Sequence, residues 1–281
     1  MKDFITYKEI KEALCAAGIE DARYETDVLI SHFCSVSPAT LPLMKNEKFD
    51  SPELISAVRK RCERYPLQYL IGSWGFCNEI YRVSPDCLIP RPETELLVEL
   101  AQKNLPAGGE FLDLCTGSGC IAVSTLAARP DCRAVAVDLF DGTLALAREN
   151  AQSNEVFKRA SFVKCDVLSP DAASCICGER KFDALLSNPP YIKTEDIASL
   201  EPELFSEPLA ALDGGDDGLI FYRAIISGFA DRLNDGGFML FEAGADTARG
   251  VAELGEAAGF SSEVIADLSG IDRMIFLKKR T

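Results

Sequence analysis

One short stretch combines a carboxamide, a rigid backbone and an aromatic ring, and it reads Ser187-Asn188-Pro189-Pro190-Tyr191. The mostly apolar residues 182–186 before it predict a buried strand. Each proline lacks an N–H and fixes φ, so the strand cannot continue through them. Residues 188–191, called the tip below, therefore predict a rigid, non-helical segment with exposed carbonyl groups.

The tip suits chemistry at the nitrogen of a planar group. An amide nitrogen is a poor nucleophile because its lone pair is delocalised into the carbonyl. The side-chain oxygen of Asn188 and the carbonyl of Pro189 could accept its two N–H groups and place the nitrogen beside a reaction partner. Tyr191 offers a flat surface to pack on the planar group. The rate gain would come from positioning and electrostatics.

A second stretch predicts a binding loop for a ligand, and it reads Asp113-Leu114-Cys115-Thr116-Gly117-Ser118-Gly119. Gly117 and Gly119 allow a tight turn and the close approach of a ligand. The loop lacks the spacing of a strict G-x-G-x-x-G and has no G-K-[ST], which argues against a phosphate cradle. The alternative is a tight strand-to-helix turn that binds nothing. Residues 115–119 are called the glycine loop below.

Acidic residues stand at the ends of the predicted strands around this loop. Asp138 lies 19 residues after Gly119 and could accept hydrogen bonds from ribose hydroxyls or cap a helix. Asp166 could meet an adenine amino group or cap a turn, and Asp113 could orient a methionine group or order the loop. Without a pyrophosphate cradle, these features match S-adenosylmethionine, whose sulfonium carries a reactive methyl group.

Alternating strand-like and helix-like segments over residues 110–281 must position these groups. We expect strands near Glu110–Leu114, Arg133–Asp138, Ser161–Cys165, Phe182–Ser187, Gly237–Glu242, Ser262–Asp267 and Arg273–Leu277. Helical patterns lie between most of them. The sequence therefore predicts an α/β fold with a mostly parallel sheet covered on both faces.

Residues 1–75 predict a compact helical bundle, and residues 76–83 a short hairpin. Ser51 and Pro52 form a helix-start signal. A basic run on the same helix is either a solvated face or a docking patch for an acidic partner, and it reads Arg59-Lys60-Arg61-Cys62-Glu63-Arg64. Arg91, between two prolines, is either a structural latch or part of a substrate entrance.

The chain of 281 residues has a net charge of −15. Residues 1–90 carry 11 basic and 13 acidic side chains, and residues 91–281 carry 18 and 31. Because Lys and Arg neutralise phosphate backbones, this balance argues against direct binding of nucleic acid. No apolar run is long enough to span a membrane, and Met1–Thr6 does not resemble a signal region. We expect a cytoplasmic protein with no metal site and no membrane partner.

Together these stretches resemble the PrmC/HemK family of peptide chain release factor N5-glutamine methyltransferases. The tip alone is shared by methyltransferases that act on nitrogen conjugated to a planar group, including adenine. The combination is more specific, and its other members are the glycine loop, Pro66-Leu67-Gln68-Tyr69-Leu70-Ile71-Gly72, Leu88-Ile89-Pro90-Arg91-Pro92-Glu93-Thr94-Glu95 and Glu207-Pro208-Leu209-Ala210-Ala211-Leu212-Asp213-Gly214-Gly215. The resemblance covers essentially the whole chain.

The resemblance implies a class I S-adenosylmethionine-dependent methyltransferase fold. Its Rossmann-like, seven-stranded mixed sheet, with a reversed last strand, would occupy residues 91–281. Residues 76–90 would form a hairpin linker, and residues 1–75 a helical substrate-recognition domain. The implied reaction transfers the methyl group of S-adenosyl-L-methionine to the side-chain amide nitrogen, N5, of the glutamine in the Gly-Gly-Gln loop of class 1 release factors.

The residues and the resemblance together predict the site. The expected cofactor-binding residues are Asp113, Cys115, Thr116, Gly117, Ser118, Gly119, Asp138, Asp166, Val167 and Asn188. The expected catalytic residues are Asn188, Pro189 and Tyr191, and the expected substrate-binding residues are Asn188, Pro189, Pro190, Tyr191 and Arg91. Val167 stands where some members carry a large aromatic, so it would pack on adenine without stacking. Cys115 replaces a common glycine of the loop.

Three alternative functions stay open from the sequence. The first is methylation of a ribosomal-protein glutamine, which the motifs of the catalytic half cannot separate from methylation of a release factor. The second is methylation of adenine N6 in nucleic acid, against which the acidic balance argues. The third is a cofactor-binding protein without catalytic activity.

Overall fold

The computed structural model describes residues 4–44 and 46–279, so part of the Met1–Thr6 stretch considered above lies outside the described residues. The chain forms two compact units. The first contains Met1–Ser73 together with Glu201–Ser206, and the second contains Trp74–Leu200 together with Glu207–Thr281. The chain therefore passes between the units three times, after residues 73, 200 and 206.

The first unit is built from short helices around a small apolar core. Its elements are β1 (Ile5–Thr6), α1 (Tyr7–Ala16), α2 (Ala22–Cys34), η1 (Leu41–Leu43), β2 (Lys48–Phe49), α3 (Pro52–Cys62) and α4 (Leu67–Ile71). β1 and β2 pair antiparallel. The Ser51 side chain accepts from the N–H of Leu54, so it caps α3 as predicted. Helices this short depend on the packing of their apolar faces, here through fully buried Leu14 and Leu29.

The basic run on α3 is divided between the interior and the surface. Arg61 is buried, and its Nε and Nη2 donate to the two carboxylate oxygens of Glu25 at 2.6 and 3.0 Å. Its Nη1 donates to Glu203 at 2.9 Å, as does Nη2 of Arg64 at 2.9 Å. Neither sequence interpretation of the run therefore describes Arg61 and Arg64, which hold the first unit together. The preceding two basic residues are exposed.

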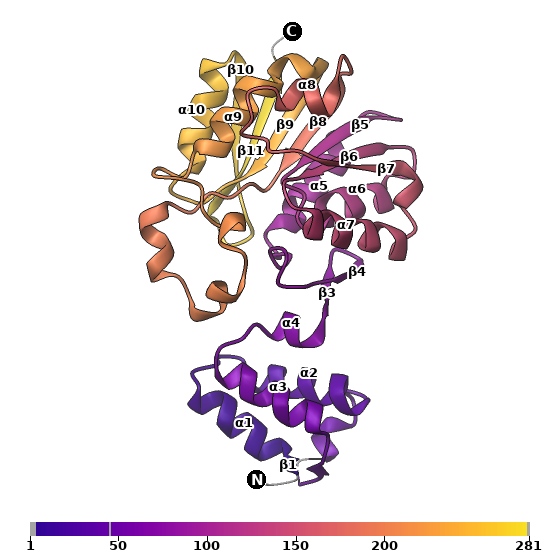
Figure 1. The fold of residues 1–281 in the computed structure, drawn as a ribbon, viewed down its shortest axis with the longest axis vertical. Helices are drawn as coiled ribbons and strands as arrows, with labels where there is room; N and C mark the ends of the chain where they lie inside the picture. The colour runs from indigo at the N-terminus through magenta and orange to yellow at the C-terminus, as the bar shows by residue number, and fades with distance from the viewer. Residues whose placement is uncertain (1–3, 45, 280–281) are drawn as a thin grey trace. The chain divides into compact units, whose positions relative to one another are not determined.

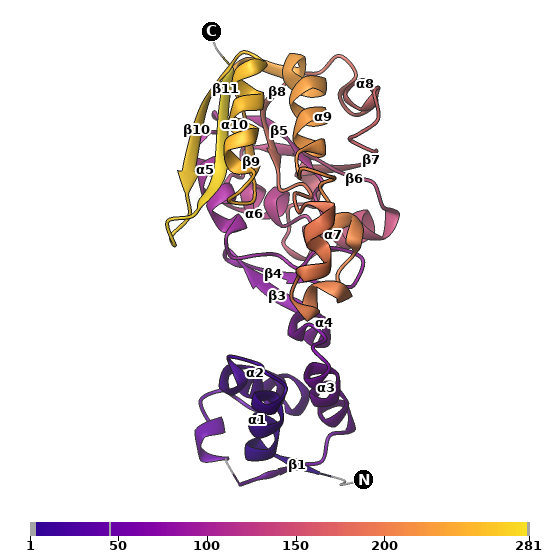
Figure 2. The same cartoon turned by 90° about the vertical axis from the view of Figure 1, so that its left-hand side faces the viewer.

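The second unit contains a seven-stranded sheet, as predicted. Its strands are β5 (Glu110–Leu114), β6 (Arg133–Asp138), β7 (Ala160–Lys164), β8 (Phe182–Ser187), β9 (Leu233–Glu242), β10 (Phe260–Ala266) and β11 (Asp272–Lys279), and their spatial order is β10-β11-β9-β8-β5-β6-β7. β11 runs antiparallel to both of its neighbours, whereas the pairs from β9 to β7 are parallel. The expected reversed last strand is confirmed, and it lies near one edge of the sheet (Figure 2).

Helices cover both faces of this sheet (Figure 1). One face packs on α5 (Thr94–Asn104), α6 (Cys120–Ala128) and α7 (Asp141–Ser153), and the other on α8 (Ala172–Cys177), α9 (Ile220–Phe229) and α10 (Ala248–Ala257). Short 3-10 helices occupy the connections, namely η2 (Phe157–Arg159), η3 (Thr194–Ser199), η4 (Pro202–Ser206), η5 (Leu209–Ala211) and η6 (Ala230–Arg232). Side chains of the central parallel strands face both helix layers alternately, so β5, β6 and β8 are mostly buried and mostly apolar.

The hairpin formed by β3 (Ser73–Phe76) and β4 (Glu79–Arg82) packs into the second unit. Phe76 and Tyr81 are buried in the core beside α5 and α6. The Tyr81 hydroxyl shares a 2.5 Å hydrogen bond with Ser124 of α6. Residues 76–90, expected as a linker, therefore contribute to the core of the second unit.

A long segment between β8 and α9 returns to pack against the tip. Ile192 forms a parallel bridge with Asp213, and the Gly214 N–H donates to the Ile192 carbonyl at 2.8 Å. A Cβ on Gly214 would lie 2.7 Å from the Cα of Tyr191 and 2.9 Å from the Pro190 carbonyl oxygen. Only glycine therefore fits this close approach of two backbones.

None of the helices in residues 4–44 and 46–279 has the length and apolar character needed to cross a membrane. Over the same residues, no group of three or more His, Cys, Asp and Glu side chains is placed to hold a metal ion.

Candidate active site

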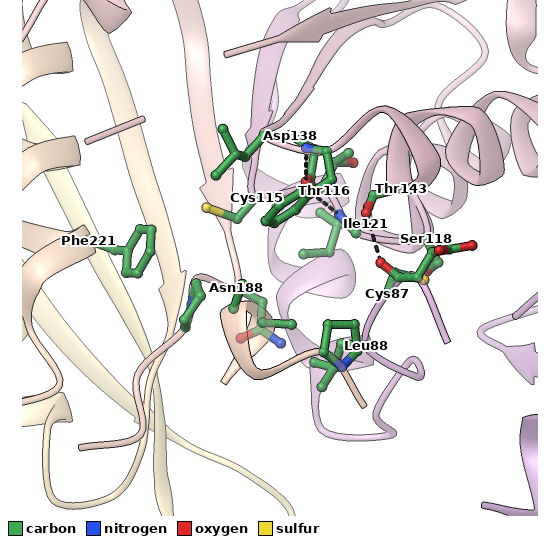
Figure 3. A pocket seen from close by; sticks show the side chains of 18 of the residues that line it. Cys87, Leu88, Cys115, Thr116, Ser118, Ile121, Asp138, Thr143, Asn188 and Phe221 are labelled. Carbon is green, nitrogen blue, oxygen red and sulfur yellow. Dashed lines mark hydrogen bonds between the residues drawn. The ribbon is translucent and has the colours of Figure 1, made fainter. Parts of the chain in front are cut away.

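A cavity of about 340 Å³ lies at the carboxyl ends of β5, β6, β7 and β8 (Figure 3). The chain order of the strands reverses between β5 and β8, because β6 and β7 follow on one side and β9 on the other. Ligands of open α/β sheets bind at such reversal points, outside the carboxyl ends of the strands. The fold therefore provides a binding site at this position.

The cavity brings the glycine loop and the tip together. Its lining includes ten of the predicted site residues, namely Arg91, Cys115, Thr116, Gly117, Ser118, Asp138, Asp166, Val167, Asn188 and Pro190. Four other predicted residues are not among the described lining residues, namely Asp113, Gly119, Pro189 and Tyr191. Figure 3 shows the side chains of Cys115, Asp138 and Asn188 gathered around the cavity from different segments.

The glycine loop has a left-handed backbone at alternate positions. Cys115, Gly117 and Gly119 have φ values of 59°, 55° and 82°. A non-glycine residue in this region carries strain of order 1 kcal/mol, so the backbone at Cys115 would favour glycine. A Cβ on Gly117 would have no heavy atom within 4 Å, so the space beside this backbone is open to a ligand.

Asp113 lies beneath the loop and is fully buried. Its Oδ2 accepts from the Thr116 hydroxyl at 2.5 Å and from the Ala122 N–H at 3.1 Å. Burial raises the pKa of Asp113 to about 7 although these hydrogen bonds lower it. Of the two predicted roles, the geometry fits the one in which Asp113 orders the loop.

Asp138 also bonds to the loop and lies at the cavity wall. Its Oδ2 accepts from the Gly117 N–H at 3.0 Å, and its Oδ1 accepts from the Phe140 N–H at 3.2 Å. Burial raises the pKa of Asp138. Two carboxylate oxygens offer about four acceptor positions, so capacity remains for hydroxyl groups of a ligand. The predicted capping and ligand-binding roles are therefore compatible.

The apolar part of the cavity lies next to Asp166, which follows β7. Asp166 accepts from the Leu168 N–H at 2.9 Å, so it caps the turn after β7. Val167 is buried at the cavity wall. Leu139 and Phe140, which follow Asp138, add partly exposed apolar surface. This pocket can take a flat, largely apolar group such as a nucleobase.

Arg91 is held by a buried carboxylate. Its Nη2 lies 2.5 Å from Glu207, whose other oxygen accepts from the Ile89 N–H at 2.9 Å. The Glu207 side chain is 1% exposed. The ion pair joins two stretches that are over a hundred residues apart in the sequence. Arg91 therefore fits the latch alternative, and it also lines the cavity.

The tip is fixed from behind by two buried side chains. Asn188 Nδ2 lies 3.2 Å from the Thr94 hydroxyl, which donates to Glu242 Oε2 at 2.6 Å. Burial raises the pKa of Glu242 to about 7, although bonds from Thr94 and the charge of Arg273 lower it. Burial likewise raises the pKa of Tyr191 to about 12. Tyr191 packs against the core on the α9 and α10 side of the sheet.

Several lining residues were not predicted from the sequence. They are Asp86, Cys87, Leu88, Ile89, Pro90, Thr94, Cys120, Ile121, Leu139, Phe140, Thr143, Cys165, Leu168, Pro208, Ala210, Ala211, Asp213 and Phe221. Thr94 and Ile89 lie within stretches that carried the family resemblance, which is the available signal for them. Phe221 lies at the start of α9 and carries no sequence signal.

Comparison with known proteins gives matches over nearly the whole chain. The family models described as "PrmC N-terminal domain" and "Methyltransferase small domain" match residues 6–72 and 92–226. The release factor glutamine methyltransferase of Geobacter sulfurreducens is 37% identical over 93% of this chain and 91% of its own. That of Cereibacter sphaeroides is 40% identical over 93% of each chain. The chain belongs to the release factor glutamine methyltransferase family.

A solved structure agrees with the fold of this family. A methyltransferase from Pyrococcus furiosus is 20% identical, covers 72% of this chain and 89% of its own, and gives a TM-score of 0.54. At this identity the likeness shows the fold alone. The class I methyltransferase fold, predicted from the sequence, is confirmed.

Members of the release factor glutamine methyltransferase family use S-adenosylmethionine, and the residues present here fit this cofactor. The open backbone at Gly117 admits close approach of a ligand. Asp138 retains acceptor positions at the cavity wall, and Val167 with Phe140 provides apolar surface. Among the described lining residues, the basic side chain is Arg91, and it is already paired with Glu207. These residues therefore provide no cationic cradle for a pyrophosphate.

Proposed function

We propose that this protein methylates the side-chain amide nitrogen, N5, of the glutamine in the Gly-Gly-Gln loop of class 1 peptide chain release factors. The names of its relatives support this substrate. The single observation that carries the proposal is that Asn188 of the tip lines the same cavity as the glycine loop. A target nitrogen held by the tip would thus face the methyl donor.

Each part of the cavity has a task in this proposal. When bound, S-adenosylmethionine supplies an electrophilic methyl group. Asp138 accepts bonds from the ribose hydroxyls, and Val167 with Asp166 holds the adenine. Asn188 and the Pro189 carbonyl accept the two N–H groups of the target amide. Tyr191 packs on the amide plane, so catalysis rests on orientation and electrostatics.

The helical unit is proposed to recognise the release factor. Its match to the PrmC N-terminal domain supports this division of labour, with residues 1–75 for recognition and residues 91–281 for methyl transfer. Because class 1 release factors act in translation, the proposed site of action is the cytoplasm, without a nucleic-acid or membrane partner. The small net charge of residues 1–90 is compatible with a protein partner.

Incubation with labelled S-adenosylmethionine and a class 1 release factor tests this function. We expect label on the intact release factor and none on its variant with Gln→Ala in the Gly-Gly-Gln loop. Equal labelling of both would contradict the proposal, as would preferential labelling of ribosomal proteins or DNA in parallel reactions. Mass spectrometry of the labelled peptide would locate the methyl group on the glutamine.

The matched enzyme variant for this assay is Asn188→Ala. It removes the side-chain acceptor for the target amide, so we expect methyl transfer to fall by about 100-fold or more. Binding of S-adenosylhomocysteine should change little, because Asn188 is one of many cavity residues. Full methyl transfer by this variant would contradict the role proposed for the tip.

A further inference from the structure

Three side chains from different elements form a hydrogen-bonded chain that begins at the cavity wall. Asn188 follows β8, Thr94 begins α5 and Glu242 ends β9. The Asn188 Nδ2 to Thr94 Oγ1 distance is 3.2 Å, and the Thr94 Oγ1 to Glu242 Oε2 distance is 2.6 Å. Thr94 and Glu242 are 2% and 1% exposed. Buried polar groups that are paired in this way have little freedom to rearrange.

The acceptor at the end of the chain decides the direction of its hydrogen bonds. The Thr94 hydroxyl donates to Glu242 Oε2, and an ionised carboxylate can only accept, so this direction holds above about pH 7, where Glu242 is ionised. The Thr94 oxygen can then only accept from Asn188. The group of Asn188 that faces Thr94 must therefore be its NH₂, which leaves the side-chain oxygen for the cavity.

The backbone around these residues holds the chain in place. The Tyr222 hydroxyl donates to the Glu242 carbonyl at 2.7 Å, which fixes the end of β9. The Ser187 hydroxyl donates to the Leu114 carbonyl at 2.6 Å, which ties the strand before the tip to the strand before the glycine loop. The Thr94 N–H donates to the Arg91 carbonyl at 3.1 Å. These bonds fix the backbone around the chain, so the Asn188 carboxamide keeps its place beside the Thr94 hydroxyl.

We propose that Thr94 and Glu242 are positioning residues that keep the Asn188 oxygen facing the target and so make the site selective for a carboxamide over a carboxylate. The inference rests on the function proposed above. A target NH₂ donates to the Asn188 oxygen, whereas a carboxylate meets it with repulsion. If Asn188 turned over, its NH₂ would oppose the target NH₂ and would instead donate to a carboxylate.

The test compares binding of two forms of the release factor. One form has the Gly-Gly-Gln loop intact, and the other carries Gln→Glu at that position. Their Kd values are measured by calorimetry on the enzyme saturated with S-adenosylhomocysteine. The ratio of the two Kd values is insensitive to general loss of folded protein, and it reports the discrimination that the tip makes.

Thr94→Val removes the hydroxyl at nearly constant volume. We expect the preference for glutamine over glutamate to fall about tenfold, which is the effect of one lost hydrogen bond. We expect kcat to fall by at least that factor, with a smaller change in KM. Thr94→Ser keeps the hydroxyl and should recover most of the preference. An unchanged preference in Thr94→Val would overturn the inference.

Glu242→Gln provides a second variant should Thr94→Val fold poorly. Its amide can donate to Thr94, which frees the Thr94 hydroxyl to donate to a reversed Asn188. We expect a lower preference for glutamine here as well, and wild-type discrimination would count against the inference. If wild-type enzyme methylates no release factor, the proposed function fails; if it does so and the variants discriminate normally, only the inference fails.

Discussion

At the scale of single residues, Asp138 illustrates how one carboxylate can serve the loop and the ligand together. Its oxygens accept N–H groups from Gly117 and Phe140. These bonds hold the loop and the start of the α7 segment at the cavity wall. The same carboxylate retains acceptor positions for hydroxyl groups. Loss of its charge should therefore weaken a bound ligand more than it disturbs the strand on which Asp138 lies.

Asp138→Asn is predicted to weaken cofactor binding. A hydrogen bond to a charged group contributes about 1.5–3 kcal/mol, so the Kd of S-adenosylhomocysteine should rise roughly tenfold to a hundredfold. Isothermal calorimetry measures the change. Asp141→Asn is the matched control, because Asp141 is exposed and pairs with Lys164 outside the cavity. The same Kd in both variants would argue against a ligand contact by Asp138.

The pKa of Asp113 predicts a dependence of stability on pH. Burial raises this pKa to about 7, above the value of about 3.9 in an unfolded chain. The folded protein therefore binds the proton more tightly than the unfolded chain does. The resulting stabilisation is complete below about pH 4 and is lost as pH rises through about 7. Glu242, with a pKa also raised to about 7, acts in the same direction.

Thermal unfolding of the wild type and Asp113→Asn from pH 5 to pH 8 tests this prediction. We expect Tm of the wild type to fall more steeply with rising pH than Tm of the variant. A residual slope should remain in the variant because Glu242 still titrates. Parallel Tm curves would mean that the folded and unfolded pKa values of Asp113 are alike.

The sequence predicted the residues whose neighbours in the chain explain their role. Pro189 and Pro190 indicate the rigid tip, and Gly117 and Gly119 indicate the loop. Thr94 and Glu242 could not be found in this way, because their partners lie 94 and 148 positions away in sequence. Such pairs exist only once β8, β9 and α5 have been brought together. The burial of Arg61 and its pairing with Glu203 could not be predicted for the same reason, because Glu203 lies 142 positions away in sequence.

At the scale of elements, β9 shows where local patterns mislead. We predicted Gly237–Glu242, whereas the strand begins at Leu233. Asn234, Gly236 and Gly237 indicate a turn in isolation. In the pairing of β8 with β9, Phe182 of β8 faces Leu233 of β9 and Ala184 faces Phe238. The residues of β9 between Leu233 and Phe238 therefore form an irregularity within the strand. The neighbouring strand extends the element beyond the turn signal.

Gly214→Ala is predicted to displace the tip. The added methyl group would meet backbone atoms of Tyr191 and Pro190 at 2.7 and 2.9 Å, and backbone cannot move aside as a flexible side chain can. We expect loss of methyl transfer by tenfold or more, with lower Tm. Gly228→Ala in α9 is the control, since a Cβ there would have no heavy atom within 4 Å. Normal activity in Gly214→Ala would show that the tip tolerates a shift.

At the scale of the whole molecule, the first unit depends on a segment that follows the tip. Arg61 bridges Glu25 of α2 and Glu203 of η4. Burial alone would raise the pKa of Glu203, but hydrogen bonds from Arg64 and Arg61 lower it below the ordinary value. The ion pairs with Glu203 therefore weaken as pH falls through its lowered pKa.

Arg61→Ala is predicted to destabilise the first unit by about 3–5 kcal/mol, because it leaves the largely shielded Glu25 carboxylate, whose side chain is 13% exposed, without its cation. Chemical denaturation followed by far-UV circular dichroism measures the loss. Arg59→Ala is the control, since Arg59 is exposed on the same helix and should change stability by less than about 0.5 kcal/mol. Similar losses in both variants would contradict the internal role of Arg61.

The three passages of the chain between the units have a consequence for hybrid proteins. A chimaera that takes its first 73 residues from a relative would pair a foreign α3 with the original Glu201–Ser206. Mismatched partners for Arg61 and Arg64 would then weaken the transplanted module. Recombination at a single point would therefore rarely exchange the first unit intact, and a change in this unit would have to arise through coordinated change in two distant pieces of the gene.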